Sequence, residues 1–203
     1  MSDDPGRVAS APQYQDLSRF VVPPKFRGRS VLVVQLWWLV QTVFFHTSPQ
    51  VSYKWRAWLL RIFGAQIGRG VIIRPSVSVV YPWKLSIGDF SWIGDDAVLY
   101  SLGEITVGSN TVLSQGCYLC AGSHDATDVR FTITNDPIHI ADQCWLASDV
   151  FVLPGVSIGE GTVVAARSTV TRSLPGGVIA MGSPARVVGQ RFPSEEAYSQ
   201  GPA

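Results

Sequence analysis

A six-residue repeat between Ile140 and Thr171 constrains the fold of this chain more than any other feature. An aliphatic residue opens each repeat and a small residue usually follows it. The openers are Ile140, Leu146, Val152, Ile158, Val164 and Val170. An α-helix does not keep these openers on one face, because its period is 3.6 residues. A short strand and a turn in each repeat do, so the pattern predicts a parallel β-helix in which three repeats form one triangular coil.

The same repeat is present upstream, with shifts of two residues. Its openers there are Ile67, Ile73, Ile87, Ile93, Leu99, Val107, Leu113 and Leu119. The repeat stops at Cys120 and resumes at Ile140, which indicates a loop inserted between two coils. Inserted loops on solenoids tend to carry the binding face. An all-β sandwich is the alternative fold, but its strands lack a strict six-residue spacing.

The chain is expected to have three parts. Residues 1–63 are predicted to form an N-terminal arm and a helical cap, with a second short helix over 53–63 that places Trp55, Leu59, Leu60 and Phe63 on one side. Residues 64–174 are predicted to form the β-helix, with the inserted loop at 120–139, and residues 175–203 a strand over 178–180 and a tail. We expect the first 16 residues and those from Phe192 onward to be loosely held.

The most apolar stretch runs from Ser30 to His46 and contains no Asp, Glu, Lys or Arg. It is shorter than the roughly 20 apolar residues that a membrane-spanning helix needs. We expect a helix that covers the open first coil and buries Trp37, Trp38 and Phe44, because the end of a solenoid exposes core and strand edges. The alternative is peripheral contact of residues 30–46 with a membrane surface. The basic flanks suit either role; they are Arg27, Arg29, Lys54 and Arg56.

Charge and cysteine usage exclude several classes of protein. The net charge is +1 and there is no basic run, so a nucleic acid partner is not expected. Three cysteines, an odd number, and no secretory leader predict a reduced, cytoplasmic chain, with the inner face of the membrane as the alternative location. The C-x-x-C pair at Cys117 and Cys120 lies inside the repeat, which favours buried apolar packing over zinc or redox chemistry.

Histidine placement points to one residue. His124 lies in Gly122-Ser123-His124-Asp125, where the repeat breaks, and imidazole is the side chain best matched to proton transfer near neutral pH. A zinc carbonic anhydrase of the hexapeptide type needs three converging histidines, and only His124 and His139 lie near the repeat. No metal site is therefore expected.

Several short motifs together resemble one protein family. The motifs are Phe63-Gly64-Ala65-Gln66-Ile67-Gly68, Tyr81-Pro82-Trp83, Gly122-Ser123-His124-Asp125, Pro137-Ile138, Cys144-Trp145-Leu146-Ala147-Ser148, Leu153-Pro154-Gly155-Val156 and Gly182-Ser183-Pro184-Ala185-Arg186. Over residues 62–191 the chain resembles the hexapeptide-repeat acyltransferases with a left-handed β-helix. Among these it is similar to the galactoside, maltose and nodulation acetyltransferases and most of all to the colanic-acid-type acetyltransferases of exopolysaccharide biosynthesis.

The resemblance implies a homotrimer with active sites between subunits and acetyl-CoA as the acyl donor. It places the family's general base on His124 and the family's oxyanion donor, a backbone N–H, on Ser148. The positions that contact coenzyme A fall on Trp145, which lines the pantetheine arm, and on Ala166, Thr171, Arg172 and Arg186. The two arginines would meet phosphates.

The same resemblance implies transfer of an acetyl group to a sugar hydroxyl. Sugar-acetylating relatives often carry an asparagine in the coil before the loop, whereas this chain has Tyr100-Ser101-Leu102. Ser101 and Asp125 are therefore the predicted acceptor contacts, and the identity of the sugar stays open. The alternatives are N-acetylation of an amino sugar or antibiotic, and a non-enzymatic solenoid scaffold.

Overall fold

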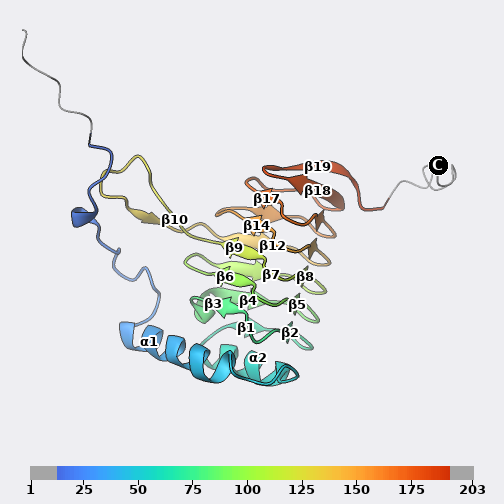
Figure 1. Cartoon of the computed structure of the whole chain (residues 1–203), viewed down its shortest axis with the longest axis horizontal. Helices are drawn as coiled ribbons and strands as arrows, with labels where there is room; N and C mark the ends of the chain where they lie inside the picture. Colours follow the sequence, from blue (N-terminus) through green and yellow to red (C-terminus); the bar gives the residue numbers. More distant parts are fainter. Residues whose placement is uncertain (1–12, 193–203) are drawn as a thin grey trace, which may run out of the picture.

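The computed structural model describes residues 13–192. The first twelve residues of the predicted arm and residues 193–203 of the predicted tail lie outside the described part. The strands stack into a triangular solenoid of about six turns, with the helices at its N-terminal end and the inserted loop projecting to one side (Figure 1).

Each side of the triangle is one sheet of short, mostly parallel strands. The first face holds β1 (Gln66–Ile67), β4 (Leu85–Ile87), β7 (Ile105–Val107), β12 (Ile138–Ile140) and β15 (Ser157–Ile158). The second face holds β2 (Ile72–Ile73), β5 (Trp92–Ile93), β8 (Val112–Leu113), β13 (Trp145–Leu146), β16 (Val163–Val164), β18 (Val178–Gly182) and β19 (Ala185–Gln190). The third face holds β3 (Ser78–Val79), β6 (Val98–Tyr100), β9 (Tyr118–Cys120), β14 (Phe151–Val152) and β17 (Thr169–Val170).

Every predicted opener is buried in the core, which confirms the repeat. Openers stack in register from coil to coil: Ile67 pairs with Ile87, 20 residues on, and Ile140 with Ile158, 18 residues on. The lower coils are longer than three hexapeptides by two residues, which accounts for the shifts of two residues in the sequence.

Coil stacking also explains the small residue after each opener. An ideal Cβ added at Gly88 would lie 2.5 Å from the backbone nitrogen of Ser109 in the next coil, and one at Gly94 would lie 2.6 Å from that of Gln115. Real Cβ atoms do not approach backbone so closely, so glycine at these corners sets the spacing between coils.

The first coil is closed by α1 (Val31–Val40), which continues as a π-helical turn η2 (Gln41–Phe45), and by α2 (Tyr53–Ile62). Side chains of these helices satisfy the backbone groups of the open strand edges. The pairs are Arg61 to Ile67 O, Arg56 to Ile73 O, His46 to Val77 O, Trp37 to Val79 O and Val79 N–H to Gln41. The predicted helical cap is therefore confirmed, and His46 is part of it.

The buried face of the cap differs from the predicted one. Trp37 is buried as expected, but Trp38 is 43% exposed and Phe44 is 52% exposed, while Phe45 is buried instead. The wider π-helical turn carries Phe45, rather than Phe44, onto the inner side. In α2, Leu59 and Leu60 pack inward as predicted, but Trp55 faces outward.

Arg56 of α2 is fully buried and donates four hydrogen bonds, to Ile73 O, Ser48 Oγ, Pro49 O and Gln50 O, at 2.6–2.9 Å. Burial lowers the pKa of this guanidinium, yet arginine stays charged at any physiological pH. Arg56→Ala is expected to destabilise the protein by about 3 kcal/mol or more, because it strands buried carbonyl groups. Thermal unfolding measures this, with exposed Lys54→Ala as the control; equal melting temperatures for the two variants would contradict it.

The N-terminal arm, with its short turn η1 (Leu17–Arg19), runs from the cap to the inserted loop. The turn η3 (Pro82–Lys84) holds it, since Trp83 Nε1 donates to Arg27 O at 2.6 Å and Lys84 Nζ donates to Phe26 O at 2.9 Å. Further out, the Asp16 N–H donates to Val129 O at 2.7 Å, so Asp16 is not loosely held as predicted. The insertion at Tyr81-Pro82-Trp83 thus anchors the arm.

Between β9 and β12 the inserted loop forms a two-stranded hairpin, β10 (Ser123–His124) and β11 (Ile133–Thr134). At the other end of the solenoid the predicted strand over 178–180 is present as part of β18. The predicted tail contains a further strand: β18 ends at Gly182, and β19 begins at Ala185 and pairs antiparallel with β18.

The three cysteines are free thiols, and Cys117 and Cys144 are buried in the core. Burial raises the pKa of the Cys117 thiol to about 11, so it stays protonated and packs as a small apolar side chain. Residues 13–192 hold no group of three or more His, Cys, Asp or Glu placed to bind a metal ion. No helix within the same residues has the length and hydrophobicity to cross a bilayer.

Candidate active site

The loop histidine is oriented by a backbone hydrogen bond. His124 Nδ1 lies 2.8 Å from the carbonyl oxygen of Phe131 on the opposite side of the hairpin. A carbonyl only accepts, so Nδ1 carries the hydrogen of the neutral ring and Nε2 carries the lone pair. The hairpin therefore presents Nε2 as a base.

Two aromatic rings pack against this imidazole. The Phe131 ring stacks on it at 4.1 Å between ring centroids with an interplanar angle of 8°, and the Phe20 ring of the arm lies 5.8 Å away. Phe131 has a φ of 52°, which is uncommon for a bulky residue and marks a backbone held in place by its surroundings. Sequence reasoning missed both rings, because neither residue lies in a motif.

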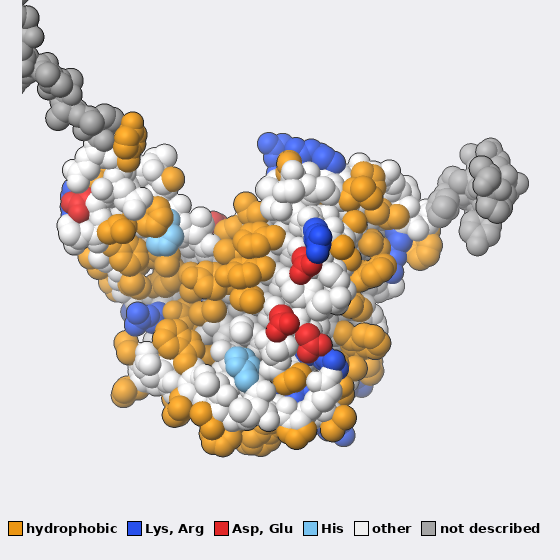
Figure 2. Space-filling view, in the orientation of Figure 1, with side chains coloured by type: hydrophobic (Ala, Val, Ile, Leu, Met, Phe, Trp, Pro, Cys, Tyr) orange, Lys and Arg blue, Asp and Glu red, His pale blue; other side chains and the backbone are white. Residues whose placement is uncertain are grey.

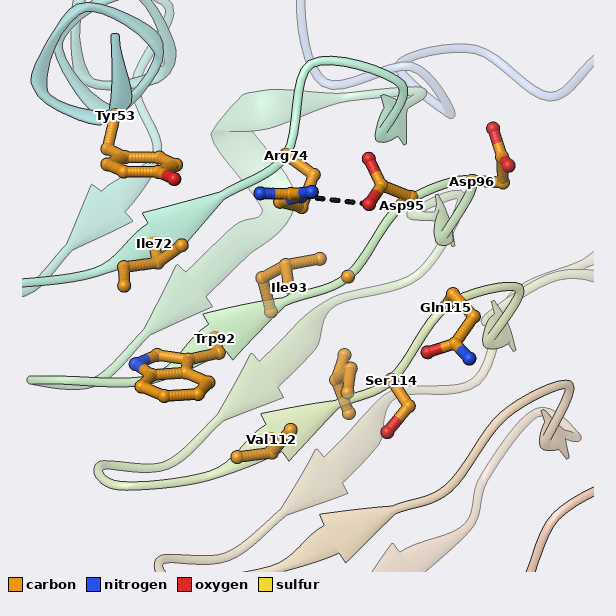
Figure 3. Close-up of a pocket in the computed structure, with 12 residues that line it drawn as sticks. Tyr53, Ile72, Arg74, Trp92, Ile93, Asp95, Asp96, Val112, Ser114 and Gln115 are labelled. Carbon is orange, nitrogen blue, oxygen red and sulfur yellow. Dashed lines mark hydrogen bonds and ion pairs between the residues drawn. The ribbon is translucent and has the colours of Figure 1, made fainter. Parts of the chain in front are cut away.

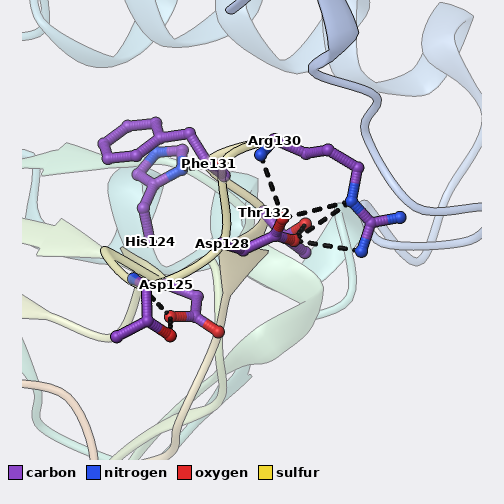
Figure 4. A network of polar contacts seen from close by, with 7 residues as sticks. His124, Asp125, Asp128, Arg130, Phe131 and Thr132 are labelled. Atoms are coloured by element: carbon purple, nitrogen blue, oxygen red, sulfur yellow. Dashed lines mark hydrogen bonds and ion pairs between the residues drawn. The ribbon is translucent and has the colours of Figure 1, made fainter. Parts of the chain in front are cut away.

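Two aspartates fix the loop around His124 (Figure 4). Asp128 accepts hydrogen bonds from the Arg130 side chain and backbone N–H and from the Thr132 hydroxyl, and these hold its pKa far below the ordinary range. Asp125 Oδ1 accepts from the Thr127 hydroxyl and backbone N–H, and its pKa is lowered in the same way. What the structure shows for Asp125 is a role in loop geometry; acceptor contact stays a prediction.

Asp128→Asn is expected to lower kcat by about 10-fold while the KM for acetyl-CoA stays constant, because Phe131 and His124 lose a fixed backbone. Folding lowers the pKa of Asp128. The stability that its ionised carboxylate gives the loop is therefore complete above the unfolded-state pKa of about 3.9, and it is lost only as pH falls through the lower pKa of the folded state. Loop order should therefore not change between pH 6 and 8. Steady-state kinetics test this, with Glu160→Gln as control, and an unchanged kcat would contradict it.

His124 lines a cavity of about 540 Å³ formed by the arm, the cap, the third face and the hairpin. Its lining is mainly apolar and aromatic: Phe20, Val22, Phe26, Arg27, Trp38, Gln41, Ser78, Val79, Val80, Tyr81, Tyr100, Leu102, His124 and Ile133. A largely apolar cavity with a few polar groups is typical of a small-molecule site. Its walls come from segments far apart in the sequence, so no local pattern predicts it.

The structure contradicts the prediction that Ser101 contacts an acceptor. Ser101 is fully buried, and its hydroxyl accepts from the Tyr81 N–H at 2.8 Å and donates to Tyr81 O at 3.1 Å. Both roles of the hydroxyl are occupied inside the solenoid. Ser101 therefore fixes Tyr81, whose ring lines the cavity.

The residues predicted to contact coenzyme A lie on the upper coils, at their surface. Trp145 is 48% exposed on β13, and its Nε1–H donates to Ser114 Oγ at 3.1 Å. The Ser148 N–H has no acceptor among the hydrogen bonds of residues 13–192, as an oxyanion donor requires. The backbone N–H groups of Gln115 and Ala166, which hold the same position in the neighbouring coils, also have no acceptor within residues 13–192. The open N–H is therefore a property of this turn position.

Thr171, Arg172 and Arg186 are exposed near the C-terminal end of the solenoid. Neither arginine takes part in an ion pair within the described part of the chain, and Arg186 Nη1 donates only to the neighbouring Ala185 O at 3.0 Å. Such guanidinium groups suit an anionic ligand.

Within one protomer, His124 and its cavity lie apart from the residues predicted to contact coenzyme A. The hairpin that carries His124 follows β9 of the third face and precedes β12 of the first, whereas Trp145 lies on β13 of the second face. The cavity that His124 lines includes none of the predicted coenzyme A contacts. A separate groove of about 610 Å³ runs over the second face, where Tyr53, Trp92, Ser114 and the Arg74–Asp95 ion pair line it (Figure 3).

Known proteins share both the sequence and this architecture. The WcaF protein of Escherichia coli K12, an acetyltransferase provisionally named for colanic acid biosynthesis, is 59% identical over 181 residues, covering 89% of this chain and all of WcaF. A galactoside acetyltransferase in complex with coenzyme A has a TM-score of 0.74 at 23% identity and covers 84% of each chain. A Vibrio cholerae hexapeptide-repeat acetyltransferase in complex with acetyl-CoA has a TM-score of 0.72 at 23% identity, covering 82% of this chain and 92% of that one. No family model matches.

The solenoid, its helical cap and the similarity to WcaF define the class of protein. The chain belongs to the hexapeptide-repeat acetyltransferases, whose coils form a left-handed β-helix. It is an acyltransferase.

Proposed function

We propose that the enzyme transfers the acetyl group of acetyl-CoA to a sugar hydroxyl in exopolysaccharide biosynthesis, with His124 as general base. The orientation of His124 carries the proposal, since Phe131 O fixes the proton on Nδ1 and leaves Nε2 as the base. The 59% identity to WcaF supports the acceptor class. The cavity beside His124 supports it too, because a largely apolar and aromatic lining with a few polar groups is typical of a small-molecule site.

The chemistry needs no covalent acyl-enzyme. His124 Nε2 takes the proton from the acceptor hydroxyl as that oxygen attacks the thioester carbonyl carbon. The Ser148 N–H stabilises the oxyanion that develops on the carbonyl oxygen, an interaction worth about 3 kcal/mol. When the carbon–sulfur bond breaks, the imidazolium returns its proton to the departing thiolate, so ester and thiol form with no net change in the enzyme.

Trp145, Ala166, Thr171, Arg172 and Arg186 are the proposed contacts of coenzyme A. The exposed Trp145 ring offers an apolar surface to the pantetheine arm, and the guanidinium groups of Arg172 and Arg186 match phosphate charge and geometry.

A homotrimer with shared sites is also part of the proposal. Two of the three outer faces carry large apolar side chains: Trp92 and Trp145 on the second face, and Tyr118 and Phe151, stacked at 5.0 Å, on the third. The outward residues of the first face are polar: Gln66, Ser86, Thr106, His139 and Ser157. A cyclic trimer buries two different faces of each protomer and leaves one exposed. Contact between the second and third faces of neighbours would also bring His124 of one protomer toward Trp145 of the next.

The proposed reaction is tested with isotope-labelled acetyl-CoA and a panel of sugar acceptors that carry hydroxyl or amino groups. The expected product is a sugar ester, which gains one labelled acetyl group by mass and loses it in mild alkali. An alkali-stable amide formed only on amino sugars would contradict O-acetylation, and the absence of transfer to every sugar in the panel would contradict the acceptor class.

A further inference from the structure

The helical cap has a second face, which the solenoid does not cover. Its exposed residues are Leu32, Leu36, Leu39, Val43 and Phe44 of α1 and η2, and Trp55, Trp58 and Ile62 of α2. We call these eight residues the outer cap face. Figure 2 shows hydrophobic side chains gathered along the edge of the molecule where Figure 1 places α1 and α2.

The outer cap face is continuous across both helices. Leu32, Leu36, Leu39 and Val43 follow one another at steps of four, three and four residues, which places them on one helical stripe. Trp55 joins the helices, because its Nε1–H donates to Phe44 O at 2.9 Å and its ring stacks on Trp58 at 5.0 Å. Contiguous apolar surface of this kind marks an interaction site, and tryptophan favours the boundary between lipid and water.

The charge around this face is of one sign. Residues 17–88 contain ten Lys and Arg and no Asp or Glu, whereas all fifteen acidic residues lie outside that range. Lys25 and Arg29, which precede α1, and Lys54, in the first turn of α2, are exposed. An apolar helical face on a segment whose own charged residues are all basic matches the surface of an anionic bilayer, where each basic side chain near the lipid adds to binding.

The geometry points to the outer cap face as a docking surface for an anionic lipid bilayer. The contact is peripheral, because α1 and η2 together span fifteen residues, about 22 Å of helix, which is less than the roughly 30 Å hydrocarbon layer. The inner side of the same helices closes the first coil, so one element both caps the solenoid and binds the lipid surface.

Docking of the outer cap face on a bilayer would place the cavity that His124 lines close to the lipid surface. Trp38 and Gln41 of the cap line the same cavity as His124. If the proposed sugar transfer holds, this position suits an acceptor attached to a membrane lipid. Binding to the bilayer itself does not depend on that reaction.

Sedimentation of the full chain with vesicles tests the inference. Vesicles of phosphatidylcholine with 30% phosphatidylglycerol are compared with pure phosphatidylcholine, at low salt and at 0.5 M NaCl. We expect the anionic vesicles to bind at least 10-fold more strongly than the neutral ones, and the difference to shrink at high salt. Leu32→Gln/Leu36→Gln/Leu39→Gln should lose at least 10-fold in binding, and Lys25→Glu/Lys54→Glu should lose the preference for anionic lipid.

Val187→Gln/Val188→Gln, two exposed residues of β19 at the other end of the solenoid, is the matched control and should bind as wild type. An unchanged melting temperature in the leucine variant shows that its fold is intact. Absence of binding to anionic vesicles, or equal binding by wild type and the leucine variant, would overturn the inference. The inference would also be overturned if the particle mass of the wild type doubled with rising protein concentration and that of the leucine variant did not. That outcome would assign the outer cap face to contact with a second copy of the assembly.

Discussion

His124→Ala is expected to lower kcat for acetyl transfer by about 100-fold or more, the usual contribution of a positioned general base. The reason is specific to this geometry: Nδ1 is bonded to Phe131 O, so Nε2 is the ring atom that we propose takes the acceptor proton. Coenzyme A should bind as before, because its proposed contacts are Trp145, Ala166, Thr171, Arg172 and Arg186, whereas the proposed role of His124 is proton transfer from the acceptor. Steady-state kinetics and a thermal shift with coenzyme A measure the two effects.

His139→Ala is the matched control for this variant. His139 is exposed on the first face, on β12, and its backbone N–H bonds Val156 O within the solenoid. It should retain wild-type turnover. A His124→Ala enzyme with wild-type kcat would remove the general base from the proposed mechanism.

Deletion of residues 1–62 is expected to convert the protein into aggregates. The deletion uncovers the openers Ile67 and Ile73 and leaves the strand edges of the first coil without the five side chains that bond them. Exposed, unpaired edges of this kind pair with other chains. Solubility and size-exclusion profiles of the truncated chain measure the effect, and a soluble, fully active truncated enzyme would contradict the role of the cap.

Two neighbouring residues provide a finer version of the same test. Trp37 is fully buried against the coil, whereas Leu36 is exposed on the outer cap face. Trp37→Ala should destabilise the protein by about 3–5 kcal/mol, and Leu36→Ala should change stability little. Equal effects of the two substitutions would contradict the assignment of the inner and outer faces.

The solenoid was predictable because its period is short and fixed. Each opener, such as Leu146, has one allowed direction in the coil, so a pattern of aliphatic residues every six positions specifies the core. The buried side of α1 could not be predicted in this way, because the helix is apolar on every side and its sequence does not mark which side faces the core. There the hydrogen bonds of Trp37 and Gln41 to Val79, and the π-helical turn before His46, decide the orientation.

The candidate active site could be predicted only at positions that lie in a sequence motif. His124 lies in the family motif at the break of the repeat, and the structure gives it an oriented ring. Phe131 and Phe20 lie beside it through a hairpin and through an arm about a hundred residues away in the sequence, and no local pattern encodes such contacts. Ser101 was assigned wrongly, because its position near the loop does not reveal that its hydroxyl turns inward to Tyr81.

A mixed-subunit experiment tests most directly the claim that His124 of one protomer acts on acetyl-CoA held by another. His124→Ala chains and Trp145→Glu chains are expected to be nearly inactive when each assembles alone. When equal amounts are co-expressed and assemble at random, about one quarter of the interfaces in a cyclic trimer pair an intact His124 with an intact Trp145. We predict acetyl transfer at about a quarter of the wild-type rate in the mixed assembly; activity no greater than that of the two variants measured separately would contradict a shared site.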